Sequence, residues 1–415
     1  MSVAMPTVTT EIRFAAGASS TGFELGSAVL GLSTLGSAVT YTDVSSDVRS
    51  VSINRGKQRE LDEFAAGTCS VVLDNRDRDY DPLYTSSPYY VSGASQVKAG
   101  RWMRIKATHP TTGTTYDLWK GTIREWEFGY SFPSEATAMP RGTDFLEDLS
   151  QTNVSTSTTS ALSGTVAAEI LNAANILPRA LDAGQGTMGA QTLTASPALT
   201  ALQTLTKSEG GPSAAIYVDE TGDVKFEDRN SLSTNTRSNT SQATFGTAAL
   251  PVDSIELELG SSLVKNAISL TRVGGSAQTR TSTTSQDEYG IRSFVLTGLY
   301  NNTDSDVDDL AGLYLAAFED DELRVRRVTL NPRASADLMT QALSRQIRDR
   351  ITISYSPPQT SGSSTVTQEM FISGIAHEFS AQNMKTTFTL ESTAGRNPWW
   401  TLGSGALDTT TKLGF

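Results

Sequence analysis

The residues best suited to chemistry in this 415-residue chain are carboxylates in one short acidic segment. Asp77, Asp79 and Asp81 occupy alternate positions, as the first ligands of a calcium-binding loop do. Pro82 stands where such a loop has its turn glycine, and Pro88 stands where it has its bidentate glutamate. The segment therefore begins like a calcium site but lacks two defining residues, and we predict no bound metal.

The same segment fits a structural corner in which a strand passes into a loop. An alternating strand pattern ends at Leu73, and arginines at positions 76 and 78 interleave with the aspartates and neutralise their charge. We therefore expect Asp–Arg pairing to shape the corner. The residues predicted to form it are Asp74, Asn75, Arg76, Asp77, Asp81 and Pro82.

Other residue types offer little for catalysis. The chain has two histidines, His109 and His377, and a single cysteine, Cys69, which excludes an internal disulfide and a Cys-rich zinc site. Ser262 and Lys265 have the S-x-x-K spacing of penicillin-recognising enzymes, but the partner motifs of those enzymes are missing. The sequence also lacks a phosphate-binding loop and a dinucleotide fingerprint. We predict no catalytic residues, no enzymatic activity and no cofactor.

Charge and hydropathy exclude two further classes of function. The chain has 33 Lys+Arg against 45 Asp+Glu and a net charge of −12, which argues against electrostatic binding to nucleic acid or anionic lipid. The weakly polar run 23–39 lacks a preceding basic region and is interrupted by glycines. It is therefore not typical of a signal peptide or a spanning helix, and we predict no membrane insertion.

Aromatic residues are the remaining candidates for a binding surface. Tyr84, Tyr89 and Tyr90 cluster in a proline-containing loop, and Trp399 and Trp400 lie near the end of the chain. Tyrosine and tryptophan are favoured at protein interfaces, so we predict that these residues contact neighbouring subunits. Carbohydrate recognition by the tyrosines is the alternative.

The elements that would position these residues are mostly strands. Apolar and polar residues alternate at 48–54, 68–74, 102–107 and 116–128, and strand patterns return from residue 256 onward. The middle third instead shows two helical stripes, at 165–177 and from an N-cap at Ser196, followed by a hairpin at 214–229. Further helices are expected at 143–149, at 335–346 and after an N-cap at Ser305, and 151–160 is expected to be a linker.

An internal echo connects the first and last strand regions. Gly121 and Gly374 each follow an aromatic by two or three residues and precede another by five, and an Arg-led alternating strand comes before each. Chance recurrence of glycine and aromatics in a β-rich chain is one explanation. The alternative, which we favour, is that 40–150 and 255–395 are two copies of one antiparallel barrel. A glycine within such a strand indicates a bulge or a close backbone approach.

Four segments resemble minor tail proteins of long-tailed bacteriophages. They are Arg49–Pro82, which includes the acidic corner, Val97–Ile105, Leu118–Ile123 and Tyr289–Ser293, and the resemblance is strongest over 44–125. It implies the central baseplate or tail-tip hub, a protein of mainly β class. The implied chain has two similar antiparallel β-barrel tube domains and an inserted small helix–hairpin domain. The expected domains are 1–150 (first barrel), 151–254 (α+β insertion with linkers), 255–395 (second barrel) and 396–415 (C-terminal anchoring tail).

The resemblance also implies a place and a set of partners. We expect a structural homotrimer of the virion, assembled in the host cytoplasm, whose six similar barrels match the sixfold tail tube to a threefold distal tip. Its expected partners are the tail tube, the tape measure protein, and distal and other tail-tip proteins. DNA would pass through its channel without specific binding. A receptor- or carbohydrate-binding tip module and a cell-wall hydrolase are the alternatives.

Overall fold

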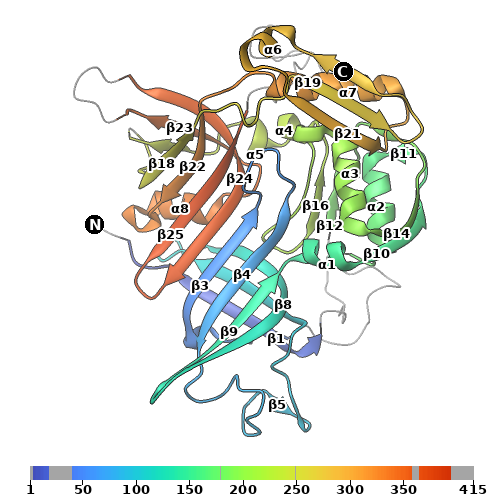
Figure 1. Ribbon diagram of the computed structural model, residues 1–415. Helices are drawn as coiled ribbons and strands as arrows, with labels where there is room; N and C mark the ends of the chain where they lie inside the picture. Colours follow the sequence, from blue (N-terminus) through green and yellow to red (C-terminus); the bar gives the residue numbers. More distant parts are fainter. Residues whose placement is uncertain (1–2, 18–39, 178, 248, 358–363, 394–415) are drawn as a thin grey trace.

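The computed structural model describes residues 3–17, 40–177, 179–247, 249–357 and 364–393 (Figure 1). The chain is mainly β over these residues, with helices concentrated in its middle third and in two later segments. This agrees with the predicted class. None of the described helices has the length and apolar character that crossing a membrane requires.

The first third of the chain forms strands whose alternate side chains are buried. β3 (Val48–Gly56) and β4 (Ala65–Asp74) pair antiparallel, and Val51, Ile53 and Val71 are buried on their inner face. The other elements of this third are β1 (Thr7–Gly17), β2 (Thr42–Asp43), η1 (Ser45–Asp47), β5 (Tyr90–Val91), β6 (Ala94–Ser95), β7 (Arg101–Thr108), β8 (Thr115–Ser131), β9 (Glu135–Thr143) and α1 (Phe145–Gln151).

The last third repeats the strand order of the first. The strands that form this second set are β18 (Ser254–Glu258), β22 (Arg324–Leu330), β23 (Arg350–Tyr355), β24 (Val366–Ser380) and β25 (Met384–Ser392). The sheet runs β3-β4-β9-β8-β7 in one set and β18-β22-β25-β24-β23 in the other. When each set is numbered along the chain, both have the order 1-2-5-4-3, with antiparallel pairing throughout. We call these two sets the first and second repeat.

The two repeats lie in one 13-stranded sheet because β24 pairs with β3 (Figure 1). The described strands form no closed barrel, so the prediction of two closed barrels is not confirmed. In the first repeat, β1 pairs with β2, but η1 separates β2 from β3, and the outer edge of β3 pairs with β24 instead. A barrel closes only when its first and last strands pair. Here β3 pairs with β24 of the other repeat, so the first repeat stays open.

The middle third contains the two predicted helices and the predicted hairpin, together with strands that the sequence patterns did not reveal. The helices are α2 (Ser163–Ala173) and α3 (Ala198–Gly210), and the hairpin consists of β15 (Ala215–Val218) and β16 (Val224–Glu227). Further strands are β10 (Asn153–Ser157), β11 (Ala161–Leu162), β12 (Arg179–Leu181), β13 (Thr187–Met188) and β14 (Thr192–Pro197), and α4 (Ser231–Thr234), α5 (Thr236–Asn239) and β17 (Thr244–Gly246) end the segment.

Two predictions for this segment are wrong. The expected linker 151–160 contains β10, which pairs with β14. Ser196 does not cap α3, because it lies in β14 and Pro197 takes the N-cap position without a side-chain hydrogen bond. Pro197 also restricts Ser196 to extended backbone, which suits a strand better than a helix start.

The second repeat carries a long excursion between its first two strands. It contains β19 (Ala267–Arg272), β20 (Gln278–Thr281), α6 (Thr283–Tyr289), β21 (Ser293–Leu299) and α7 (Asp304–Phe318). These elements enclose a small core of their own, formed by Ile268, Leu270, Leu299, Val307, Leu310, Ala311, Tyr314 and Phe318. The predicted cap of α7 at Ser305 is wrong, because Thr303 and Asp306 form a capping box. The helix predicted at 335–346 is α8 (Ala336–Ser344), and Ser335 is its N-cap.

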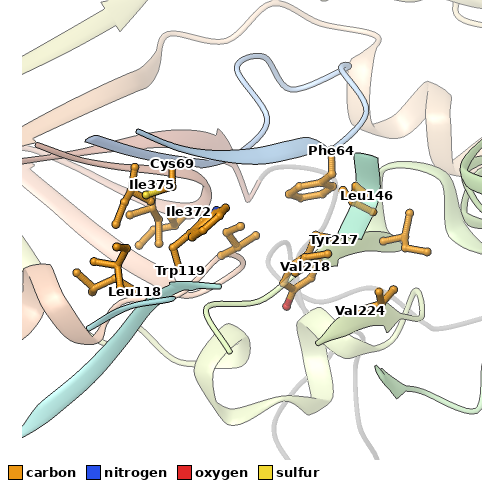
Figure 2. Packing of buried hydrophobic residues seen from close by; sticks show 14 of the residues in the cluster. Phe64, Cys69, Leu118, Trp119, Leu146, Tyr217, Val218, Val224, Ile372 and Ile375 are labelled. Atoms are coloured by element: carbon orange, nitrogen blue, oxygen red, sulfur yellow. The ribbon is translucent and has the colours of Figure 1, made fainter. Parts of the chain in front are cut away.

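The main core is shared by both repeats and the middle third. Trp119 of β8 is 1% exposed and lies in the same group of side chains as Cys69, Ile372 and Ile375 (Figure 2). Figure 2 shows a second group in which Phe64 of the β3–β4 connection lies near side chains of α1 and of the β15–β16 hairpin. Burial of these large apolar surfaces therefore holds the three parts together.

Candidate assembly surfaces

The acidic corner begins where β4 ends. The Nη2 atom of Arg76 lies 2.6 Å from Oδ2 of Asp74, and Nη2 of Arg49 lies 3.1 Å from the same oxygen. Hydrogen bonds from Arg76, followed by those from Arg49, hold the pKa of Asp74 well below its ordinary value. Glu135, at the far end of the β8–β9 hairpin, accepts a hydrogen bond from Arg49 at 2.7 Å. The corner and the hairpin are therefore tied together.

The rest of the corner folds the following loop back onto the sheet. The side chain of Asn75 is buried, and its Oδ1 accepts a hydrogen bond from the backbone N–H of Tyr80 at 3.0 Å. The hydroxyl of Tyr80 donates to Asp47 at 2.6 Å. Asp81 accepts from the N–H of Leu83 at 2.9 Å, and its other oxygen lies 2.8 Å from Nη2 of Arg78. Both arginines of the segment are thus paired with its aspartates.

Asp77, Asp79 and Asp81 do not converge on one point. Among the described residues, no group of three His, Cys, Asp or Glu side chains is arranged to hold a metal ion. Asp81 is occupied by Arg78, and Asp77 is exposed. Burial and then the negative charges of Asp47 and Asp77 raise the pKa of Asp79, which a bound cation would lower. The corner therefore does not offer a calcium ion a set of converging ligands.

The loop tyrosines pack mainly against their own chain. The ring of Tyr89 stacks on Phe14 with centroids 3.9 Å apart, Tyr84 lies beneath the guanidinium of Arg78, and Tyr90 donates to the carbonyl of Gly93. All three tyrosines are half-buried. Trp399 and Trp400 lie outside the described residues.

The apolar side chains that are most exposed at this end of the molecule are a leucine and a phenylalanine. Leu83 of the loop is 84% exposed, and Phe132 at the tip of the β8–β9 hairpin is 92% exposed. Figure 1 shows the loop around β5 and this hairpin tip projecting at the same end of the molecule. The sequence reasoning missed them because the exposure of a single leucine or phenylalanine leaves no pattern in the sequence, even though Leu83 stands beside Tyr84 and Phe132 beside Pro133.

The echo glycines lie in equivalent strands, with different neighbours. A Cβ at Gly121 of β8 would collide with the carbonyl oxygen of Thr143 and lie 2.6 Å from the ring of Trp119. A Cβ at Gly374 of β24 would lie 2.9 Å from the carbonyl oxygen of Lys57, and the β24–β25 register shifts between Ile372 and Gly374. Both glycines therefore allow a close approach of a neighbouring backbone, and Gly121 also makes room for an aromatic ring.

The strand pairing between the repeats is a junction that the sequence patterns did not reveal. β24 pairs with β3 from Gly374 opposite Gly56 to Ser380 opposite Ser50. Gly56 has a φ of +98°, and a Cβ there would collide with the carbonyl oxygen of Ser373 and lie 2.6 Å from Cα of Gly374. Glycine at position 56 thus allows the two repeats to approach this closely.

Buried ion pairs surround this junction. Lys57 Nζ lies 2.7 Å from Glu391 Oε2 of β25, and both side chains are at most 7% exposed. Glu60 pairs with Arg324 of β22, which is also buried. The connection between β3 and β4 is therefore bound to two strands of the second repeat. These partners are hundreds of residues apart in the chain, so no local motif could identify them.

The two histidines are buried and serve the packing. Nδ1 of His109 accepts hydrogen bonds from the N–H groups of Thr111 and Thr112, at 3.1 and 3.2 Å, which shapes the β7–β8 turn. His377 of β24 lies 3.0 Å from the hydroxyl of Thr386. Burial, assisted by the positive charge of Arg55, lowers the pKa of His377 to about 3, so the ring is neutral near pH 7.

Known protein structures contain the same architecture. No protein-family model and no curated protein matches the sequence. The structure is similar to the 43 kDa tail protein of prophage MuSo2 from Shewanella oneidensis, with 11% identity, a TM-score of 0.57, and coverage of 94% of this chain and 98% of that one. It is also similar to a tail protein from Neisseria meningitidis MC58, with 11% identity, a TM-score of 0.58, and coverage of 94% and 97%. Both matches span nearly the full length of each chain, so the chain has the fold of these tail proteins.

Proposed function

We propose that this chain is a structural tail-tip hub, a trimer that joins a sixfold tail tube to a threefold distal tip. The observation that carries the proposal is the strand order 1-2-5-4-3, which occurs twice in one chain with the repeats joined edge to edge. Three such chains carry six similar units around one axis. A ring of this kind presents six equivalent contacts to the tube and three to the tip.

The partners follow from this position. On one side the ring would contact the tail tube and the tape measure protein, and on the other side the distal and other tail-tip proteins. DNA would pass through the ring without specific binding, and the net charge of −12 favours release over adhesion. The proposed place of the chain is the virion, after assembly in the host cytoplasm, and we assign it no catalytic role.

The alternative is a receptor- or carbohydrate-binding tip module. The observation in its favour is the projecting end of the molecule, where Leu83 and Phe132 are almost fully exposed. Tyr84, Tyr89 and Tyr90 support it less, because their rings and hydroxyls are engaged within the chain. Glycan-array binding that is lost on replacing Phe132 would favour this alternative over the hub.

The hub proposal is tested by the mass and symmetry of the assembled protein. Light scattering on the purified full chain should give three times the monomer mass of 44.3 kDa. Averaged electron micrographs of the particle should show a ring on the tail axis with six similar lobes and threefold detail. A dimer, or a location away from the axis, would contradict the proposal.

A further inference from the structure

The small sheet of the excursion has one covered face and one open face. Its middle strand is β19, with β20 and β21 on either side, and α7 packs along one face. On that face Leu270 is fully buried, and Arg272 and Arg280 pair with aspartates of α7 at 2.5 Å. The alternate residues of the same strands point away from α7. On β20 and β21 these alternate residues are all exposed, so the described parts of the chain leave this second face uncovered. We call it the open face.

The open face carries no charged side chain. Val295 is 61% exposed, and Ile291, just ahead of β21, is 73% exposed. The strand residues that share the open face through their cross-strand pairing are Ala267, Ser269, Thr271, Thr279, Thr281, Ser293, Val295 and Thr297. β19 and β21 pair parallel, and parallel strands are usually covered on both faces. An uncharged, partly apolar sheet face on a chain with a net charge of −12 therefore indicates a surface that another segment covers.

The segment that follows β25 begins at the foot of the excursion. Ser392, the last residue of β25, donates a hydrogen bond to Glu322 at 2.6 Å. Glu322 stands shortly after Phe318, the last residue of α7. The carbonyl of Phe318 accepts a hydrogen bond at 2.6 Å from the N–H of Lys265, just ahead of β19. The chain therefore leaves β25 close to the start of the open face.

The sequence of this segment suits the open face. Thr393 is the last described residue, and the run 397–407 that follows it contains Trp399 and Trp400 and no charged residue. From Thr393 to Trp399 an extended chain reaches about 20 Å. This reach is comparable to the path from Glu322 through α7's last turn to the start of β19. Both tryptophans can thus come to lie on the open face of their own chain.

Charge complementarity supports the same placement. Four consecutive acids stand between α7 and β22: Glu319, Asp320, Asp321 and Glu322. Asp321 accepts from the hydroxyl of Tyr289 and Glu322 from that of Ser392, and no ion pair joins the four acids to a described cation. Arg396 stands just ahead of the uncharged run. A chain that leaves β25 toward the open face carries this guanidinium past the acids.

We propose that the segment 396–407 docks on the open face of the excursion in the same chain, with Trp399 and Trp400 against Ile291 and Val295. Arg396 then lies beside the four acids, and the parallel strands β19 and β21 are covered on both faces. The sequence predicts a neighbouring subunit as the contact of these tryptophans, but the place where the segment begins favours its own excursion. This docking does not depend on the proposed ring.

Tryptophan quenching tests the docking in the full chain. Three of the five tryptophans are buried or half-buried within the described residues, namely Trp102, Trp119 and Trp126. Acrylamide should therefore quench the wild-type emission weakly. Val295→Lys puts a charge under the docked segment and should release both remaining tryptophans, which raises the Stern–Volmer constant about twofold. Val91→Lys is the matched control, because Val91 is 52% exposed but lies in β5 at the opposite end of the molecule (Figure 1). It should leave the constant unchanged.

Hydrogen exchange provides the reciprocal readout. The full chain with Trp399→Ala and Trp400→Ala should exchange the amides of β19 and β21 about fivefold faster than the wild type, because these strands lose their cover. The β15–β16 hairpin lies in the middle third and should exchange at the wild-type rate.

Two results would overturn the docking. If wild type and Val295→Lys are quenched equally, and the double alanine variant exchanges β19 and β21 at the wild-type rate, the segment does not cover the open face. If quenching of the wild type rises on dilution of the protein, the tryptophans are covered by a neighbouring copy and not by their own chain. Neither result bears on the mass and symmetry by which the hub is judged.

Discussion

Replacing Gly56 by alanine tests the junction between the repeats most directly. The residue has a φ of +98°, which costs a residue with a Cβ about 1–2 kcal/mol. The added methyl would also collide with the Ser373 carbonyl and lie 2.6 Å from Cα of Gly374, and both are backbone groups in a paired strand. Overpacking of this kind costs about 1–3 kcal/mol. We expect Gly56→Ala to lower the free energy of unfolding by about 3 kcal/mol.

The matched control is Gly113→Ala in the β7–β8 turn. Gly113 has a φ of +71°, and a Cβ there would meet no atom within 4 Å, so only the backbone strain of about 1 kcal/mol is expected. Urea unfolding followed by tryptophan fluorescence gives both values under one set of conditions. If Gly56→Ala costs no more than Gly113→Ala, the close approach of β3 and β24 does not exist as described.

Three further predictions concern charge and metal. Because the pKa of His377 is lowered in the folded protein, the unfolded chain binds a proton more readily. The free energy of unfolding should therefore be highest above pH 6.5 and lower by about 2 kcal/mol at pH 5. Urea unfolding measured at several pH values should show this dependence in the wild type and not in His377→Asn. Lys57→Ala leaves the buried Glu391 without its lysine, so it should lower the free energy of unfolding by about 3–5 kcal/mol. The double variant with Lys57→Met and Glu391→Leu should recover most of this loss. If Lys57→Ala is as stable as the wild type, the ion pair does not exist as described. Millimolar calcium should leave the thermal midpoint unchanged, and a rise abolished by Asp77→Asn would show a metal site after all.

The strand regions could be predicted because their core contacts repeat every second residue. Val51, Ile53 and Val71 mark their strands by burial on one face, and the pattern is visible without knowing the partner strand. Helix ends were predicted less well. Ser335 and Thr303 both cap helices, but Ser305 offered an equally good local signal, and the choice depends on the capping box with Asp306.

The arrangement of the repeats could be predicted only in part. The echo around Gly121 and Gly374 indicated duplication, because both glycines lie in the fourth strand of their repeat. Closure of each repeat could not be judged, since strand edges carry no sequence pattern that names their partner. The same holds for Lys57 and Glu391, whose pairing depends on tertiary contact alone.

The two repeats differ most in the connection between their first two strands. The connection between the first two strands is the short segment 57–64 in one repeat and the whole excursion 259–323 in the other. Lengthening a surface connection costs little chain entropy and leaves the paired strands undisturbed. In the proposed ring of three chains, a long and a short connection would alternate. New recognition parts could thus evolve on every second unit while the common framework stays intact.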